Sequence, residues 1–118
     1  MITKAEIIEV ISELVKIDSV NSWLIPGGAG EKEVQSHIQN YLSGLGVTSE
    51  WEQIDETHWN LTATLKGTGG GKNITLYAHA DTVGCELWAD RAMIPELRGD
   101  RLIGLGAADD KGFCAAMM

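Results

Sequence analysis

Four ionisable side chains follow apolar segments of this sequence and are placed where they could share a ligand. His79 and Asp81 end one apolar segment, and Asp109 and Asp110 lie in a glycine-containing loop further along. Residues i and i+2 of an extended chain point to the same side, so His79 and Asp81 are predicted neighbours. A metal-binding imidazole commonly donates its second ring N–H to a carboxylate. The alternative is a histidine that only hydrogen-bonds to an aspartate in a turn.

The segment before His79 has the pattern of a strand that is buried on both faces, because apolar side chains recur from 74 to 78. Ligands of open α/β sheets bind just outside the carboxyl ends of strands. We therefore expect a strand at 73–79, antiparallel to a strand at 60–66. The glycine-rich segment 67–71 is interpreted as their hairpin loop, since no helix and no Lys-Ser/Thr pair follows it as in a phosphate loop.

The loop at 104–112 allows three interpretations. Gly104-x-Gly106 resembles the start of a dinucleotide fingerprint, but Asp109 occupies the third glycine position and puts negative charge where phosphate would bind. The second interpretation is a sharp turn that brings a carboxylate to a cation such as Zn²⁺, which accepts aspartate oxygen together with histidine nitrogen. In the third, Asp109 or Asp110 caps the helix that is expected to begin near Gly112.

Taken together, these motifs resemble a known family. The segments 79–83 (His-Ala-Asp-Thr-Val) and 104–112 (Gly-x-Gly-x-Ala-Asp-Asp-Lys-Gly), with Pro95 and Gly99-Asp100 between them, are similar to the dizinc amidohydrolases and exopeptidases. That family includes acetylornithine deacetylase, succinyl-diaminopimelate desuccinylase, carboxypeptidase G and aminoacylase. The resemblance extends over essentially the whole chain. It departs at Leu105, where arginine is common, and at Phe113, where a second glycine is common.

The resemblance implies a role for each candidate residue. His79 would bind one zinc ion, and Asp109 would bridge two zinc ions. Asp81 would be the catalytic residue that orients His79. Asp110 would follow Asp109 through a cis peptide bond, and Gly112 would let the last helix pack closely. Cobalt or manganese would substitute for zinc.

The implied fold class is α/β, a partial three-layer sandwich with a mixed β-sheet and flanking helices. Residues 1–118 would be the front part of a dizinc exopeptidase catalytic domain. In the family, two metal ions activate water and polarise the carbonyl of a small acyl-amino acid or peptide. In the family, the general base, the other ligands and a lid or dimerisation domain come later than the position of Met118. The resemblance also implies that the parent enzyme is a homodimer. Substrate-binding residues are not identified. The alternative is a catalytically inactive α/β fragment or association module.

Two amphipathic helices and several short strands are predicted to position these residues. Thr3 and Glu6 form a capping box for a helix that ends near Ile17, and a second helix begins near Glu31. Strands are expected at 47–54 and 101–103, and the segment 85–98 is expected to be irregular. The uncharged segment 112–118 has the pattern of a buried helix, which indicates the front part of a longer protein. Both His37 and His58 are expected at the surface.

Composition restricts the partners of the chain. The net charge of −8 comes from 17 acidic and 9 basic residues, which argues against nucleic-acid and anionic-membrane partners. No segment approaches the roughly 18 apolar residues of a membrane span. The N-terminal residues lack the pattern of a signal peptide, and Cys85 and Cys114 form no metal or redox motif. We therefore expect free thiols and a cytoplasmic location.

Overall fold

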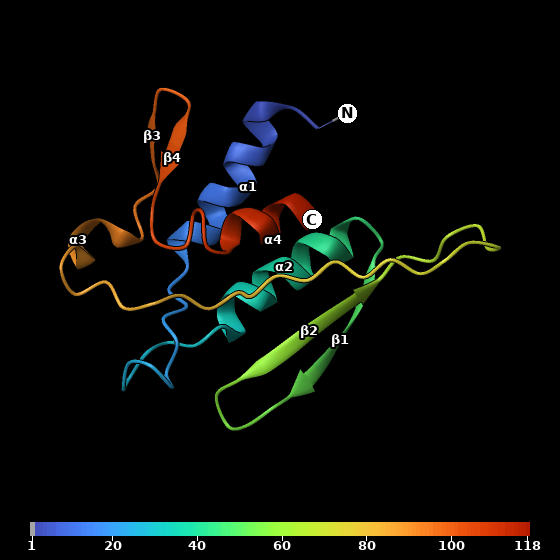
Figure 1. Ribbon diagram of the computed structural model, residues 1–118, viewed down its shortest axis with the longest axis horizontal. Coiled ribbons are helices and arrows are strands. Elements are labelled where there is room, and N and C mark those ends of the chain that lie inside the picture. Colours follow the sequence, from blue (N-terminus) through green and yellow to red (C-terminus); the bar gives the residue numbers. More distant parts are fainter. Residues whose placement is uncertain (1) are drawn as a thin grey trace.

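The structure is a computed structural model that describes residues 2–118, and it confirms the predicted α/β class (Figure 1). Two small antiparallel sheets lie on either side of a central group of helices. In chain order the elements are α1 (Lys4–Lys16), α2 (Lys32–Gly44), β1 (Thr48–Gln53), β2 (Trp59–Thr64), α3 (Ala89–Ala92), β3 (Glu96–Arg98), β4 (Arg101–Ile103) and α4 (Lys111–Met117).

Helix α1 begins at the capping box that the sequence predicts. The Thr3 hydroxyl accepts a hydrogen bond from the Glu6 backbone N–H at 3.3 Å, and the Thr3 backbone N–H donates to the Glu6 carboxylate at 2.7 Å. These two bonds satisfy donors that the first turn of a helix leaves without partners. The apolar face of the helix then buries Leu14 and Val15 completely.

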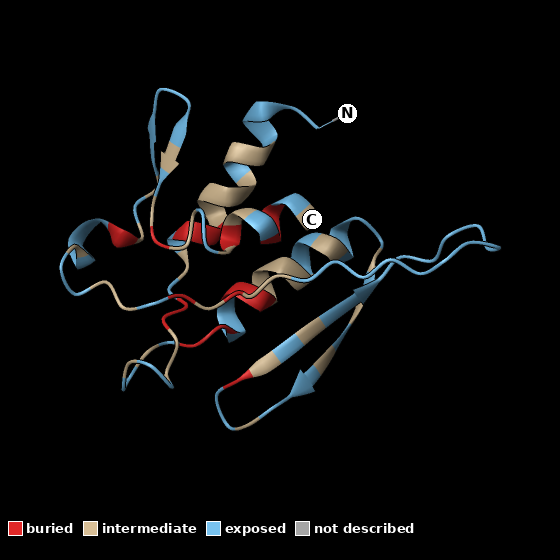
Figure 2. Cartoon of the chain, viewed as in Figure 1, coloured by how far each residue is buried: buried red, intermediate tan, exposed pale blue. Residues whose placement is uncertain are grey.

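The core joins elements that are distant in sequence. Helix α4 lies against α1, and α2 closes the same apolar cluster from the other side (Figures 1 and 2). The buried members of this cluster are Leu14, Val34, Ala80, Cys114 and Ala115. A second cluster joins Val20, Ala92 and Leu105 and lies beneath α3 and the loop before α4. The residues next to Ala80 are therefore held by packing, not only by their own backbone.

Each sheet is a single antiparallel hairpin. β1 pairs with β2 from Thr48 opposite Thr64 to Gln53 opposite Trp59, and α2 is tied to this sheet by a hydrogen bond from the Gln35 amide to the Trp59 carbonyl. β4 was expected, but β3 and α3 fall in the segment that we expected to be irregular. β3 has a single apolar residue, Leu97, between two charged ones, so no apolar segment marks it in the sequence.

The expected strand at 73–79 is wrong for the residues that the structure describes. The segment is extended but pairs with neither β2 nor any other named strand, so the mixed sheet is not formed within residues 2–118. Ile74 and Tyr77 are 86% and 82% exposed. A strand with apolar residues on both faces needs covering layers on both sides. The apolar pattern in the sequence indicates that such layers cover the segment, but residues 2–118 do not provide them.

The surface position predicted for His58 is also wrong, because its side chain is 4% exposed. It follows the tight turn between β1 and β2, where Asp55 accepts hydrogen bonds from the backbone N–H groups of Thr57 and His58. A polar turn in the sequence gave no indication that another loop would cover it.

No helix within residues 2–118 combines the length and the apolar composition needed to cross a membrane. The helices α1 and α2 have 13 residues each. Cys85 is half-buried and Cys114 is buried, and both are free thiols.

Leu14 offers a direct test of the core. Replacing it with alanine should lower the free energy of unfolding by about 2–5 kcal/mol, because the side chain is fully buried and its removal leaves a cavity. The measurement is urea unfolding followed by circular dichroism. The matched control is Leu87→Ala, at a side chain that is 100% exposed, which should change stability by less than about 0.5 kcal/mol. Equal losses in both variants would contradict this core.

Candidate functional site

The imidazole of His79 lies between two carboxylates that come from different parts of the chain. Its Nε2 is 2.9 Å from Oδ1 of Asp109, and its Nδ1 is 3.2 Å from Oδ1 of Asp81. The side chain of His79 is 40% exposed and that of Asp109 is 88% exposed, so this edge of the group is open to solvent. The structure thus brings together the three side chains that the sequence analysis selected.

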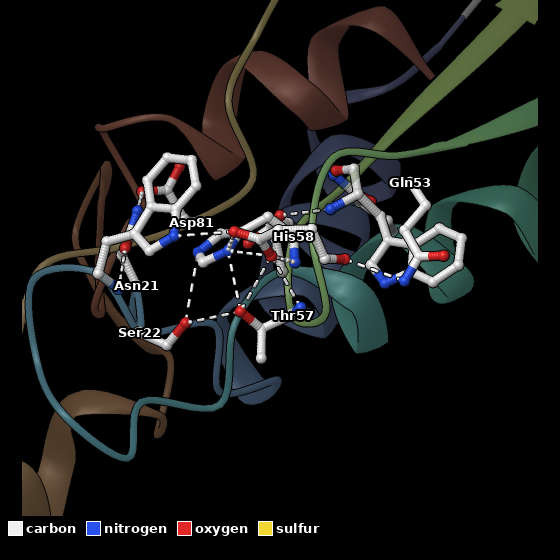
Figure 3. Close-up of polar contacts among 11 residues, drawn as sticks. Asn21, Ser22, Gln53, Thr57, His58 and Asp81 are labelled. Carbon is white, nitrogen blue, oxygen red and sulfur yellow. Dashed lines mark hydrogen bonds and ion pairs between the residues drawn. The ribbon is translucent and has the colours of Figure 1, made fainter.

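Asp81 is held in place by the loop that follows α1. The side-chain amide of Asn21 donates to Oδ2 of Asp81 at 2.8 Å (Figure 3). The backbones of the two segments also pair, since Thr82 N–H donates to the Ser19 carbonyl and Asn21 N–H donates to the Thr82 carbonyl, both at 2.9 Å. Asn21 therefore fixes one oxygen of Asp81 and leaves the other facing His79. Sequence reasoning missed this asparagine, because it stands in a segment that signalled only the end of a helix.

The backbone of His79 is tied to the first turn of α4. Its N–H donates to Oδ2 of Asp110 at 3.4 Å, and its carbonyl accepts from the Cys114 thiol at 3.4 Å. Asp110 occupies the N-cap position of α4, but its side chain makes no capping hydrogen bond. The expected N-cap position of Asp110 is therefore confirmed, but the capping hydrogen bond expected from its side chain is not formed. Its carboxylate instead connects α4 to the segment that carries His79.

Glycines let the loop before α4 approach its neighbours closely. Gly106 has a φ of +75°, which favours glycine, and a Cβ there would lie 2.7 Å from Cγ2 of Thr82. A Cβ at Gly112 would lie 2.5 Å from the Ala107 carbonyl oxygen. The peptide bond between Asp109 and Asp110 is cis. The side chain of Asp109 reaches His79 from this tightly turned loop.

The two carboxylates change the protonation of His79. Desolvation lowers the pKa of the imidazole, but the hydrogen bond that the ring donates to Asp109 and the negative charge of Asp81 act in the opposite direction. Together they raise the pKa above its usual value. A metal ion binds Nε2 only when that nitrogen carries no proton, so metal binding is favoured at higher pH.

Two side chains of this group fit a metal ion, and a third is missing. Ligands about 2.0–2.2 Å from a tetrahedral zinc ion lie roughly 3.3–3.6 Å apart. The Nε2 to Oδ1 distance of 2.9 Å would therefore have to open by less than an ångström. Asp81 at Nδ1 favours the tautomer that leaves Nε2 facing Asp109. Residues 2–118 contain no group of three or more His, Cys, Asp or Glu side chains arranged around one ion.

A cavity of about 230 Å³ lies next to His79 and Asp81. Trp23, His58 and Tyr77 also contribute to its wall. The cavity places mixed aromatic and polar surface beside the open edge of the imidazole. This volume is below the roughly 300–1,000 Å³ that is typical of ligand pockets, so the cavity accommodates only part of a drug-sized molecule.

Lys111 lies beneath the same loop and is fully buried. Its ammonium donates to the Ile17 carbonyl at 2.6 Å, and its backbone N–H donates to the Gly106 carbonyl at 2.9 Å. Desolvation lowers the pKa of the ammonium to about 8, although the charge of Asp18 opposes this. Lys111 thus joins the end of α1 to the loop that carries Asp109.

Comparison with known proteins gives several bacterial acetylornithine deacetylases as relatives. The chain is 32% identical to the Vibrio cholerae protein over 110 residues, which are 92% of this chain and 29% of that protein. It is 32% identical to those of Photorhabdus laumondii and Proteus mirabilis over 113 residues, again 92% of this chain and 29% and 28% of those proteins. The chain therefore spans less than a third of the length of these relatives. No protein-family model matches it.

The buried ammonium of Lys111 should make stability depend on pH. Between the folded pKa of about 8 and the ordinary value of 10.5, the folded protein has lost this proton and the unfolded chain retains it. Stability from this group therefore rises with pH across that window. The raised pKa of Cys114 acts in the opposite direction above pH 9, so the range to compare is pH 7.5 to 9.

Urea unfolding in chelator-treated buffer measures this effect. The rise in the free energy of unfolding between pH 7.5 and 9 should be present in the wild type and lost in Lys111→Met. The matched variant Lys72→Met, at an exposed position, should keep it. An unchanged pH slope in Lys111→Met would show that the buried ammonium is not its source.

Proposed function

We propose that this chain forms the first part of the catalytic domain of a metal-dependent amide hydrolase, whose parent enzyme removes the acyl group from an amino acid such as N-acetylornithine. The observation that carries the proposal is the meeting of His79 and Asp109 at 2.9 Å in a chain that resembles acetylornithine deacetylases along 92% of its length. An imidazole and a carboxylate that converge in this way are a common ligand pair for zinc and similar ions.

Zinc is the metal that we propose, with cobalt or manganese as substitutes. His79 and Asp109 would hold it, and in the parent enzyme Asp109 would bridge to a second ion. A divalent cation at this position would polarise the scissile carbonyl as a Lewis acid. Asp81 would hold the proton on Nδ1 of His79, so that the lone pair of Nε2 stays directed at the ion. Asn21 would keep Asp81 in that orientation.

By itself, the chain is proposed to be inactive. Residues 2–118 bring only two of the proposed ligands together and contain no third one at the same point. The general base and the remaining ligands would come from the part of the parent enzyme that these residues do not include. A homodimeric enzyme in the cytoplasm, acting on a small acyl-amino acid or peptide, is the parent that we propose.

One observation favours a second role for the chain itself, as an association module. The extended segment that includes Ile74, Leu76 and Tyr77 carries exposed apolar side chains. Such a row is typical of a surface that another polypeptide covers. This role and the first are compatible, because the covering polypeptide would be the rest of the catalytic domain.

Metal binding by the chain tests the proposed site. We expect one weakly held Zn²⁺ or Co²⁺ per chain, measured by isothermal titration and by the visible spectrum of cobalt. His79→Gln should abolish binding, and Asp81→Asn should weaken it by about 10- to 100-fold, because Asp81 orients the ligand. His37→Gln, on helix α2 and outside the group around His79, is the control and should bind as the wild type does. Two tightly held ions per chain, or equal binding by His79→Gln, would contradict the proposal.

The catalytic part of the proposal is tested on the longer parent enzyme that we propose. With zinc or cobalt added, it should release acetate from N-acetyl-L-ornithine, and the His79→Gln form should lose this activity while retaining its fold. Metal binding without hydrolysis of any acyl-amino acid would contradict the proposed activity but not the proposed metal site.

A further inference from the structure

A second group of reactive side chains lies on the far side of Asn21 from the His79 site. His58 is 4% exposed, and its Nδ1 is 2.9 Å from Oδ1 of Asp55 (Figure 3). On the other side of the ring, Nε2 is 3.3 Å from the hydroxyl oxygen of Ser22. A carboxylate, an imidazole and a hydroxyl therefore follow one another in that order. Within residues 2–118 no hydrogen bond joins these three side chains to His79 or Asp109, although His58 and His79 line the same cavity.

Asp55 is fixed as a hydrogen-bond acceptor. Its carboxylate accepts from the backbone N–H groups of Thr57 and His58, each at 2.8 Å, and from the indole N–H of Trp23 at 3.0 Å. The Thr57 backbone bond is the main cause that holds the pKa of the Asp55 carboxyl well below its usual range. An ionised Asp55 favours the proton on Nδ1 of His58. Nε2 is then the ring nitrogen without a proton, and the Ser22 hydroxyl lies 3.3 Å from it and 3.3 Å from Oγ1 of Thr57.

The ring and the hydroxyl differ in their access to solvent. The indole of Trp23 covers the imidazole of His58, with ring centroids 3.9 Å apart. Ser22 itself is only half-buried. The base is therefore sheltered and fixed in orientation, while the hydroxyl beside it can be approached by a reagent.

Backbone contacts hold the loop that carries Ser22 against the turn that carries His58. The Gly30 N–H donates to the Val20 carbonyl at 2.9 Å, which closes the loop that carries Ser22. A Cβ at Gly30 would lie 3.3 Å from the Thr57 carbonyl oxygen, so the loop lies directly on the turn that carries His58. The order of nucleophile, base and orienting carboxylate is the one by which hydroxyl nucleophiles are activated in enzymes.

We propose that Ser22 is an activated nucleophile, with His58 as its base and Asp55 as the residue that orients His58, and that it accepts acyl groups from activated esters. The Ser22 oxygen attacks the ester carbonyl while its proton passes to Nε2 of His58. The bond from the acyl carbon to the alcohol oxygen then breaks, and the alcohol leaves with that proton. Water releases the acyl group from Ser22 as a carboxylic acid. Activated esters are the substrate class because their alcohols leave readily, which suits a contact as long as 3.3 Å.

Labelling with a fluorophosphonate reporter tests the proposal on the 118-residue chain. The serine oxygen displaces fluoride from phosphorus and forms a stable adduct, which peptide mapping by mass spectrometry locates. The reaction is run with excess EDTA, so that no metal chemistry at His79 contributes. We expect a single adduct at Ser22 in the folded protein and none in protein unfolded in urea.

Variants separate activation by His58 from simple exposure of a hydroxyl. Ser22→Ala should abolish labelling, and His58→Gln should slow it by about 100-fold or more, the usual contribution of a general base. Ser36→Ala is the matched control, because this hydroxyl is half-buried like that of Ser22 but donates to the Lys32 carbonyl, and the variant should label at the wild-type rate. Hydrolysis of p-nitrophenyl acetate should follow the same order.

Absence of labelling in the folded wild type would overturn the proposal, and so would equal labelling of a folded His58→Gln. If His58→Gln does not fold, the comparison of folded with urea-unfolded wild type decides, since an ordinary serine reacts no faster when folded. Failure here leaves the metal proposal untouched, and failure of metal binding leaves this one untouched, because the two use different residues.

Discussion

The structure depends on holding two carboxylates against one imidazole. Asp81 and Asp109 repel each other wherever both are ionised, and only a positive charge between them makes their proximity favourable. In this chain the two carboxylates raise the pKa of the His79 imidazole, so a proton bound there supplies that positive charge. A divalent cation serves the same purpose with more charge. The packing of Ala80 and Cys114 in one cluster brings the three side chains to the same point before any ligand arrives.

The local part of this site was predictable, and the tertiary part was not. The geometry of an extended chain predicts that the side chains of His79 and Asp81 are neighbours, and the structure confirms this. Nothing in residue spacing places Asp109 against the same imidazole, and that expectation came only from the resemblance to a family. Asn21 was missed because its partner is 60 positions away and its own segment carries no periodic pattern. Hydrogen bonds between loops leave no trace in hydrophobic periodicity.

The errors in the fold have the same physical origin. The capping box of Thr3 and the amphipathic face of α1 depend on residues close in sequence, and both were predicted correctly. The segment 73–79 and His58 depend on what lies against them. The first has apolar residues that residues 2–118 leave exposed, and the second is a polar residue that another loop buries. Sequence patterns report how much covering a segment needs, but they do not identify the element that provides it.

The loop after α1 connects the two groups of side chains described above. Asn21 and Ser22 are adjacent, yet the first donates to Asp81 and the second lies against His58. The two side chains contact different neighbours, so this one short loop braces both sites at once. The backbone bonds of Asn21 and Thr82 fix that loop to the segment carrying Asp81. A shift that loosened Ser22 from His58 would therefore also move Asn21, and with it the carboxylate that orients His79.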